Sequence, residues 1–322
     1  MAMSKQPEKK TPLTDQPAAS SSYHIPVLLH EAVDGLLMEE NGIYVDCTFG
    51  GGGHSREILG RLGKEGRLVV FDQDADVRAQ LPADRRVIFE PHNFRHIKRF
   101  LRLHRIDQVD GILADLGVSS HQFDEAGRGF SIRYDAPLDM RMDRRQELTA
   151  FEVIQTYTEQ RLHKIFEMYG EVTNARTLAN TIVGLRSAVS LRTVNGFKQA
   201  IGKVIKGNPN RYLAQVFQSL RIEVNDELGA LREMLGDAVG LLKPRGRIVV
   251  ITFHSLEDRL VKNFFKKGSF GDEKLQDPFG SDESKNPLRV VNKKIITPGT
   301  TELVQNKRSR SAVLRIAEKR EI

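Results

Sequence analysis

The chain has 322 residues, of which 39% are hydrophobic and 28% charged, and its net charge is +7. These values are typical of a globular protein with one large or two ordinary domains, and no apolar stretch is long enough to span a membrane. The single cysteine, Cys47, excludes an internal disulfide and favours a reducing compartment, so we expect a cytoplasmic protein with no membrane partner.

Short elements alternate through the first part of the chain. After a polar stretch and an amphipathic helix within residues 24–40, a strand, a glycine turn and a helix are predicted. Strands at 68–72, 87–90 and 111–115 follow, with a helix at 94–103. Such alternation predicts a parallel sheet that binds ligands at the carboxyl ends of its strands. The expected fold class is therefore α/β with a Rossmann-like sheet.

The glycine turn is the most informative of these elements. The apolar run 43–45 leads through Asp46 to four glycines at positions 50–53 and then into a helical pattern. A strand, a glycine turn and a helix start together expose backbone N–H groups to a nucleotide-like ligand. Asp72 ends the next apolar run about 20 residues later, the usual distance for a carboxylate that holds a ribose.

The glycine spacing separates two classes of cofactor. The dinucleotide pattern G-x-G-x-x-G would need a third glycine where Ser55 or Arg56 stands, so it does not fit. The run instead resembles the acidic-x-G-x-G-x-G loop of S-adenosylmethionine (SAM) methyltransferases, with Thr48 in place of the first glycine. A tight turn without a ligand is the alternative, but four glycines carry a large backbone entropy cost.

The alternation stops after the fourth strand and resumes with strand 247–253, which follows a turn at 243–246. Between them we predict a mostly helical insertion, residues 136–222, whose clearest helix begins at Asn208-Pro209. A helix at 226–242 returns to the sheet.

In the last part of the chain, Ser255 is expected to cap a helix and residues 268–288 to form a mobile loop. Two closing antiparallel strands are expected at 288–296 and 311–317, an arrangement that suits a methyltransferase sheet. Three parts of the chain are therefore expected. Residues 1–22 form a disordered tail rather than a signal peptide, and residues 23–135 with 223–322 form a methyltransferase core. Residues 136–222 form an inserted helical domain that recognises RNA or another substrate.

Positive charge is concentrated in the insertion. Residues 172–222 contain no Asp or Glu, and they carry eight basic side chains: Arg176, Arg186, Arg192, Lys198, Lys203, Lys206, Arg211 and Arg221. A concentrated basic segment is typical of a polyanion-binding surface. A solvated helical face that is balanced in space by acids from elsewhere is an equally open interpretation.

Six longer motifs carry a more specific resemblance: Asp115–Ser120, Gly129–Ser131, Pro137–Asp143, Asn225–Leu228, Phe253–Asp258 and Arg310–Ala312. From about His24 to the C-terminus the chain closely resembles the RsmH (MraW) family, the ribosomal small-subunit RNA cytosine-N4 methyltransferases. It departs from the family pattern at Cys47, where Gly is more common, and at His121, where Pro is common.

The resemblance implies SAM as cofactor, a cytosine of 16S ribosomal RNA in the decoding centre of the small ribosomal subunit as substrate, and a cofactor site made of seven residues. These are Gly52, Gly53, His54, Asp72, Phe94, Asp115 and Gln122. Asp72 can accept both ribose hydroxyls, and Phe94 offers an apolar wall for the adenine. Asp115 is the catalytic candidate, as a hydrogen-bond acceptor for the target amine or mainly for SAM.

Simpler roles stay open for several of these residues. Phe94 can be plain core, Gln122 a loop residue, and His54 part of a helix start. His254 and Glu257 are expected to organise a turn rather than to take part in chemistry. No histidines show the H-E-x-x-H metal spacing, so no metal is expected.

RNA contacts are expected from two places. Phe130, Tyr134 and Arg141 can stack on an unpaired base, unless their loop is only an ordered lid. Arg186, Arg192 and Lys198 of the insertion can hold flanking phosphates.

Other functions stay open at this point. A nicotinamide-dependent dehydrogenase, a SAM-binding assembly factor without turnover and a small-molecule methyltransferase are the alternatives. The oligomeric state is open as well, a homodimer included.

Overall fold

The computed structural model describes residues 26–270 and 286–321. The predicted tail at 1–22 and most of the predicted loop at 268–288 lie outside these described residues. Within them, no helix is long and apolar enough to cross a membrane.

A seven-stranded sheet forms the centre of the molecule, with strand order β3-β2-β1-β4-β5-β7-β6. Strands β1 to β5 run parallel, while β7 is antiparallel to both of its neighbours, β5 and β6. The bounds are β1 Ile43–Asp46, β2 Arg67–Phe71, β3 Val87–Glu90, β4 Val109–Asp115, β5 Leu242–Thr252, β6 Leu288–Val290 and β7 Val313–Lys319. The Rossmann-like α/β prediction and its closing antiparallel pair are confirmed.

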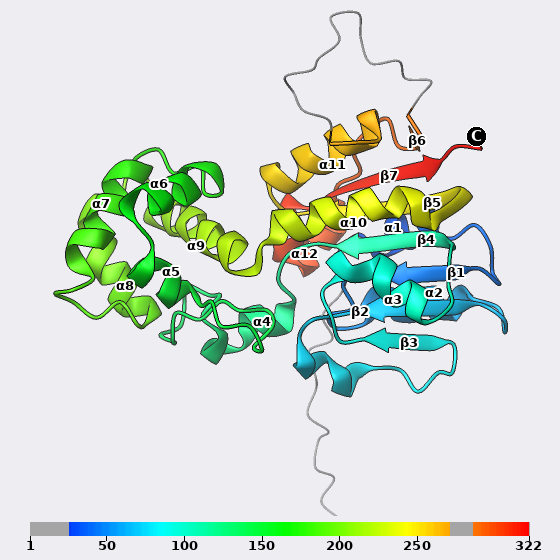
Figure 1. Cartoon of the computed structure of the whole chain (residues 1–322), viewed down its shortest axis with the longest axis horizontal. Helices are drawn as coiled ribbons and strands as arrows, with labels where there is room; N and C mark the ends of the chain where they lie inside the picture. The colour runs from blue at the N-terminus through cyan, green and yellow to red at the C-terminus, as the bar shows by residue number, and fades with distance from the viewer. Residues whose placement is uncertain (1–25, 271–285, 322) are drawn as a thin grey trace, which may run out of the picture.

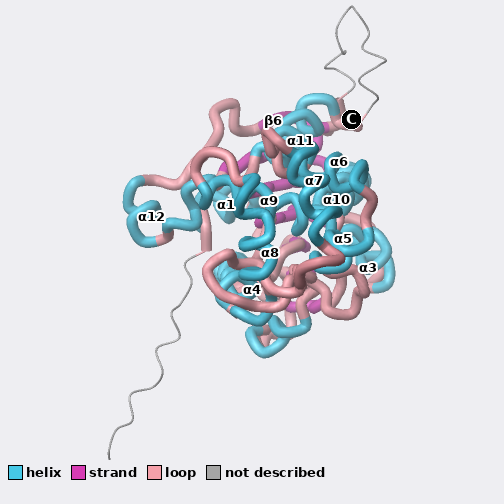
Figure 2. The backbone as a smooth tube through the Cα atoms, turned by 90° about the vertical axis from the view of Figure 1, so that its left-hand side faces the viewer, coloured by secondary structure: helices cyan, strands magenta, loops and turns pink. Residues whose placement is uncertain are grey.

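Helices cover both faces of this sheet (Figure 2). Helices α1 (Leu29–Leu36) and α2 (Gly53–Arg61) pack on one face, and α3 (Ile97–Leu103), α10 (Glu227–Leu241) and α11 (Ser255–Lys267) pack on the other. Successive residues of β2 alternate between the two apolar layers, Leu68 and Val70 on the α1 side, Val69 and Phe71 on the α10 side. This period of two is what a strand buried on both faces requires.

A separate group of helices lies beside the sheet, at the left of Figure 1. It consists of α5 Ala150–Thr156, α6 Glu159–Met168, α7 Ala175–Leu185, α8 Val194–Ile201 and α9 Pro209–Asn225. These helices share an apolar cluster that is distinct from the two clusters of the sheet. Thr149, Thr158, Thr193 and Asn208 cap the starts of four of them through side-chain oxygens.

One residue separates the helical group from the sheet layer. Helix α9 ends at Asn225 and α10 begins at Glu227, with Asp226 between them at φ 46°. Arg95 binds the Asp226 carboxylate at 2.6 Å, which compensates part of the strain of a left-handed non-glycine residue. The two helices therefore connect the helical group directly to the sheet (Figure 1).

Shorter elements complete the chain. They are α4 Ser120–Asp124, α12 Thr300–Gln305, and the 3-10 turns η1 Ala75–Gln80, η2 Phe94–His96, η3 Ala126–Arg128, η4 Gly202–Val204 and η7 Lys307–Ser311. The helix predicted at 94–103 is thus a 3-10 turn followed by α3.

One local prediction was wrong. His254, not Ser255, caps α11, because the His254 Nδ1 accepts from the Glu257 N–H and the Glu257 carboxylate accepts from the His254 N–H in return. The turn predicted at 243–246 is present as a bulge within the bounds of β5, between the pairs Val109–Leu242 and Gly111–Arg247, with Arg245 at φ 66°.

Candidate active site

The carboxyl ends of the parallel strands open into a cavity of about 950 Å³. The glycine turn, the ends of β2 and β4 and the turn after β5 line it on the sheet side. The junction of α9 and α10 lines it on the helical side. Its size lies at the upper end of the range for small-molecule sites, roughly 300–1,000 Å³.

Asp46, at the end of β1, anchors the glycine turn from below. Its buried carboxylate accepts from the Thr48 N–H at 3.0 Å and from the Ser55 hydroxyl at 2.6 Å. Gly50 has φ 51°, which favours glycine, and a Cβ at Gly53 would come within 2.0 Å of the Pro26 ring. Gly52 also has a positive φ, 71°, so glycine is favoured by backbone conformation at positions 50 and 52 and by close packing at position 53.

The glycines predicted to contact SAM, Gly52 and Gly53, differ in their position relative to the cavity. Gly53 lines the cavity together with Gly50 and Gly51. Gly52 lies against the ring of Phe49, where a Cβ would come within 2.7 Å of a ring carbon. A contact between Gly52 and SAM therefore stays a prediction.

Asp72 follows β2 and faces the same cavity. One carboxylate oxygen accepts from the Gly50 N–H at 2.8 Å and the other from the Asp74 N–H at 2.9 Å. Burial raises the pKa of Asp72 to about 7, against the effect of these two hydrogen bonds. Since an ionised carboxylate can accept about four hydrogen bonds, each oxygen retains room for one ligand donor.

Phe94 combines the two roles that the sequence left open. It packs against the apolar cluster under the sheet and also lines the cavity. The Asn93 side chain caps the turn that begins at Phe94 by accepting from the Arg95 N–H at 2.9 Å, and this fixes the ring at the rim.

Asp115 ends β4 and lies beside His54. The His54 Nε2 lies 3.1 Å from the Val27 carbonyl, and its Nδ1 lies 3.7 Å from the Asp115 Oδ2. Burial raises the pKa of Asp115 well above its usual range, with a further contribution from Asp46, while burial lowers the pKa of His54. The Asp115 Oδ1 is buried and has no hydrogen-bond partner.

One orphaned polar atom lies on the wall of this cavity. In the described part of the chain, three buried side-chain atoms have no hydrogen bond of good geometry: His92 Nδ1, Asp115 Oδ1 and His254 Nε2. The two histidine nitrogens still have carboxylate neighbours, Glu90 at 3.5 Å and Glu257 at 3.1 Å, so Asp115 Oδ1 is the one without a polar neighbour. Because unsatisfied buried groups are rare in folded proteins, this oxygen indicates a place where a ligand donor can bind.

Gln122 lines the cavity as predicted, but it also has a structural function. It completes a capping box with Ser119, and its Nε2 donates to the buried carboxylate of Asp74 at 2.8 Å. Arg128, only 2% exposed, donates to the same Asp74 oxygen at 2.8 Å and to the Met142 carbonyl at 3.1 Å. The sequence analysis missed this Asp74–Arg128 pair, whose members lie 54 residues apart.

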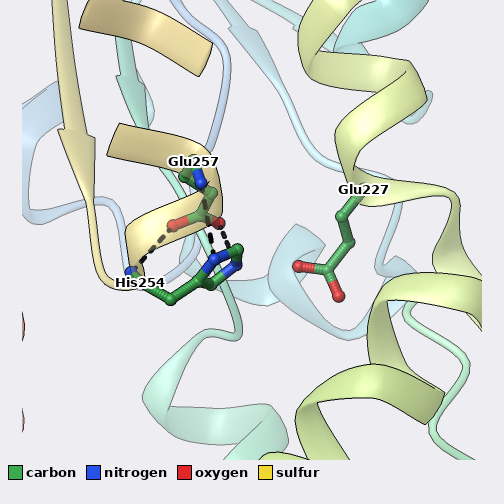
Figure 3. A group of neighbouring side chains, drawn as sticks. All are labelled: Glu227, His254 and Glu257. Atoms are coloured by element: carbon green, nitrogen blue, oxygen red, sulfur yellow. Dashed lines mark hydrogen bonds and ion pairs between the residues drawn. The ribbon is translucent and has the colours of Figure 1, made fainter. Parts of the chain in front are cut away.

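The side of the cavity opposite the glycine turn carries two acid–base pairs. Arg221 on α9 donates from Nε and Nη2 to both oxygens of Glu227 on α10, at 2.8 and 3.0 Å. The His254 Nε2 lies 3.1 Å from the Glu257 Oε1 on α11 (Figure 3). Burial by itself would raise the pKa of Glu257, but His254 and Arg221 lower it below its usual value, so Glu257 is a carboxylate.

Glu227, His254 and Glu257 are also the one group within the described residues whose ligand atoms could together approach a metal ion, all within 4.8 Å of one another. Arg221 occupies both oxygens of Glu227 and supplies the balancing positive charge. We therefore assign no metal to this group, and the absence of a metal requirement stays a prediction.

The predicted RNA-binding residues do not line the cavity; Tyr134 is exposed, and the other five have partners in the fold. Phe130 is buried in the helical cluster, Arg141 binds Asp139, Arg186 donates to the Tyr157 carbonyl, Arg192 stacks 4.7 Å from the Phe151 ring centroid, and Lys198 donates to the Ile132 carbonyl. These contacts give each residue a structural reason to be present. Their contact with RNA stays a prediction.

Comparisons with known proteins agree on one family. The model of the MraW methylase family matches residues 21–320. A protein of Bacteroides thetaiotaomicron named ribosomal RNA small subunit methyltransferase H is 53% identical over 300 residues, 93% of this chain and 98% of the relative. A protein of the same name from Flavobacterium johnsoniae is 51% identical over 298 residues, 92% of this chain and 98% of the relative.

A solved structure of an rRNA methylase from Streptococcus thermophilus is a more distant match, at 10% identity and a TM-score of 0.40, covering 92% of this chain and 99% of that one. The family model spans nearly the whole chain, including the glycine turn, Asp72 and Asp115. The chain therefore belongs to the MraW methylase family.

Proposed function

We propose that this chain uses SAM to methylate N4 of one cytosine of 16S ribosomal RNA, in the decoding centre of the small ribosomal subunit. The family and the shared name of the relatives support ribosomal RNA as the substrate. One structural observation carries the chemistry: the Asp115 Oδ1 is a buried acceptor with no partner on the wall of a large cavity. Such an atom has nothing to accept from until a ligand donor enters.

The cavity suits SAM, which when bound supplies a methyl group activated by a positively charged sulfur. Asp72 keeps one free acceptor position on each oxygen, as two ribose hydroxyls require. Phe94 gives an apolar wall for the adenine, and Gly50 and Gly53 allow close approach of the backbone.

Asp115 acts on the target amine. The N4 lone pair of cytosine is delocalised into the ring, so the amine is a weak nucleophile, and an acceptor on one N–H localises that pair. In the transfer, the N4 lone pair forms the bond to the methyl carbon, the sulfur–carbon pair stays with sulfur, and one N4 proton leaves to Asp115. The Asp115 N–H donates to the Thr48 hydroxyl at 2.7 Å, which positions the end of β4 at the cavity.

The base must leave its stack to reach Asp115, at a cost of about a few kcal/mol. Basic side chains of the helical group, among them Arg186, Arg192 and Lys198, would hold the flanking phosphates and offset that cost. The enzyme would meet this substrate in the cytoplasm, where ribosomes are assembled.

The test is incubation of small-subunit RNA, and of small-subunit particles, with labelled SAM, followed by mass mapping of the modified nucleoside. We expect one N4-methylcytidine in the wild-type reaction and none above background with Asp115→Ala. Label on a ring carbon, or on a base other than cytosine, would contradict the proposal.

The same assay addresses the remaining alternatives. A SAM-binding assembly factor would bind SAM in a calorimetric titration and transfer no label to either RNA or particles. A small-molecule methyltransferase would transfer label to cytidine or to cytidine monophosphate as well as to RNA. A dehydrogenase would bind NADH rather than SAM in the titration.

A further inference from the structure

The side of the cavity opposite the glycine turn has no role in the mechanism so far. Arg221 and Glu227 line it from the helical group and α10, and Glu257 lines it from α11. Glu227 at the start of α10 and the His254–Glu257 pair at the start of α11 point toward one another (Figure 3). Two motifs that the sequence analysis singled out, Asn225–Leu228 and Phe253–Asp258, thus meet at one place.

The charges of this wall select the kind of ligand. Arg221 faces Glu227 through two hydrogen bonds and also attracts Glu257, so its positive charge is balanced by carboxylates. A site for a phosphate or another anion keeps an excess of positive charge, which this wall lacks. The wall therefore suits a neutral ligand with its own donors and acceptors, such as a nucleobase.

Arg221 has a fixed orientation, but not all of its hydrogen-bond donors are used. Its Nε and Nη2 bind Glu227, and within the described residues its Nη1 has no protein partner. The paired edge fixes the guanidinium plane, because a bidentate carboxylate contact allows little rotation. A half-buried arginine held in this way presents fixed donors to a ligand that enters the cavity.

Asp115 and Arg221 are connected through two carboxylates. Asp115 pairs with Ile251 on β5, and two residues further on the Phe253 N–H donates to the Glu257 carboxylate at 2.9 Å. A Glu227 oxygen lies within 4.8 Å of a Glu257 oxygen, and Arg221 binds Glu227, so the neighbours follow one another as Asp115, Glu257, Glu227 and Arg221. Cytosine carries its N4 donor next to its N3 and O2 acceptors on one edge. An acceptor at one end of this wall and arginine donors at the other match that edge.

We infer that Arg221, oriented by Glu227, binds the N3 and O2 acceptors of the target cytosine while Asp115 accepts from its N4 amine. Met142, Ala230 and Leu231 line the same cavity and provide apolar surface for the ring. Uracil carries a donor at N3, which would face the arginine donors and be left unpaired. The inference rests on the proposed function and assigns the selection of cytosine to residues outside the cofactor site.

The test changes one atom of the substrate and one side chain of the enzyme together. Small subunits reconstituted with cytidine or 3-deazacytidine at the methylated position are assayed with the wild type, Arg221→Lys and Glu227→Gln. The 3-deaza base lacks the N3 acceptor, and its altered amine reactivity is the same for every enzyme. We expect the preference for cytidine in kcat/KM to fall at least tenfold in Arg221→Lys relative to wild type, and in the same direction in Glu227→Gln.

Two controls accompany these assays. Arg232→Lys changes an exposed arginine on α10 and should keep the wild-type preference. A titration with SAM should give Arg221→Lys the same affinity as wild type within twofold, which also reports that the variant is folded.

An unchanged preference in Arg221→Lys would overturn the inference, and a tenfold loss of SAM affinity with unchanged preference would assign Arg221 to the cofactor instead. Wild-type protein that methylates neither substrate would overturn the proposed function, and the inference with it.

Discussion

The rim of the sheet and the helical group use their polar residues in opposite ways. At the cavity, burial raises the pKa values of Asp72 and Asp115, and the Asp115 Oδ1 has no hydrogen-bond partner. In the helical group, Arg186 and Lys198 donate to main-chain carbonyls and Arg192 stacks on a ring. The difference indicates that the rim is incomplete without a ligand, whereas the helical group is complete as a folded unit.

A buried ion pair is one of the contacts that join the two regions. Arg128 joins Asp74, which lies just beyond the Asp72 loop, to the carbonyls of Arg141 and Met142 in the segment that leads into the helices. The floor of the cavity and the start of the helical group are therefore fixed to each other.

The largest expected effect comes from the acceptor at the rim. Asp115→Ala should lower kcat by about 10²–10⁴-fold, because the amine loses both the group that localises its lone pair and the group that takes its proton. Methyl transfer from labelled SAM measures the loss. Asp115→Asn keeps a carbonyl acceptor but has no basic oxygen, so its kcat should lie between those of the wild type and Asp115→Ala.

The matched control is Asp107→Ala, at an exposed position in the loop before β4. Full activity of Asp115→Ala would remove Asp115 from the chemistry and leave it a cofactor residue at most.

The junction should matter most for stability. Arg128→Met should lower the free energy of unfolding by about 3–5 kcal/mol, because it leaves Asp74 buried without its charge partner. Urea denaturation measures this, and Arg133→Met, at an exposed position in the next turn of chain, is the control. Asp74→Asn in the Arg128→Met background should restore part of the loss. Equal stability of Arg128→Met and wild type would show that the two regions are not joined through this pair.

The basic surface of the helical group should have a smaller, salt-dependent effect. Reversing Arg186, Arg192 and Lys198 to Glu should weaken RNA binding by about tenfold or more and reduce the slope of log affinity against log salt by about 2. Binding across a salt series measures both. Because these side chains also support the fold, the thermal midpoint of the variant must be measured first.

The control is a triple variant that changes three exposed basic residues of the sheet half to Glu: Lys64, Arg85 and Lys293. If both triple variants lose the same affinity, net charge rather than the helical surface accounts for binding.

The smallest effect concerns Asp72. Burial raises its pKa to about 7, so below that pH it is neutral and a poorer acceptor for ribose hydroxyls. The affinity for SAM should therefore fall about tenfold as the pH is lowered from about 8 to about 6. Calorimetric titration across this range measures the change. Asp72→Asn should bind more weakly at about pH 8 and lose most of the pH dependence, and a dependence that survives intact would point to another group.

The sequence by itself determined the sheet and its cofactor rim. The glycine turn, Asp72 and Asp115 could be predicted because each follows an apolar strand, and parallel strands bring their carboxyl ends to one edge. A local pattern therefore defines a spatial site. A mostly helical insertion could also be predicted, at 136–222, from the Asn208-Pro209 start and the apolar periodicity, and the helices α5 to α9 run from Ala150 to Asn225.

Only the tertiary structure decided which distant side chains meet. The contacts of Arg221 with Glu227 and of Arg128 with Asp74 depend on how α9, α10 and the cavity floor pack, and no local period encodes that packing. It also decided that Arg186, Arg192 and Lys198 have partners inside the fold. A charge count in sequence cannot separate a solvated cation from one that a carbonyl or a ring already holds.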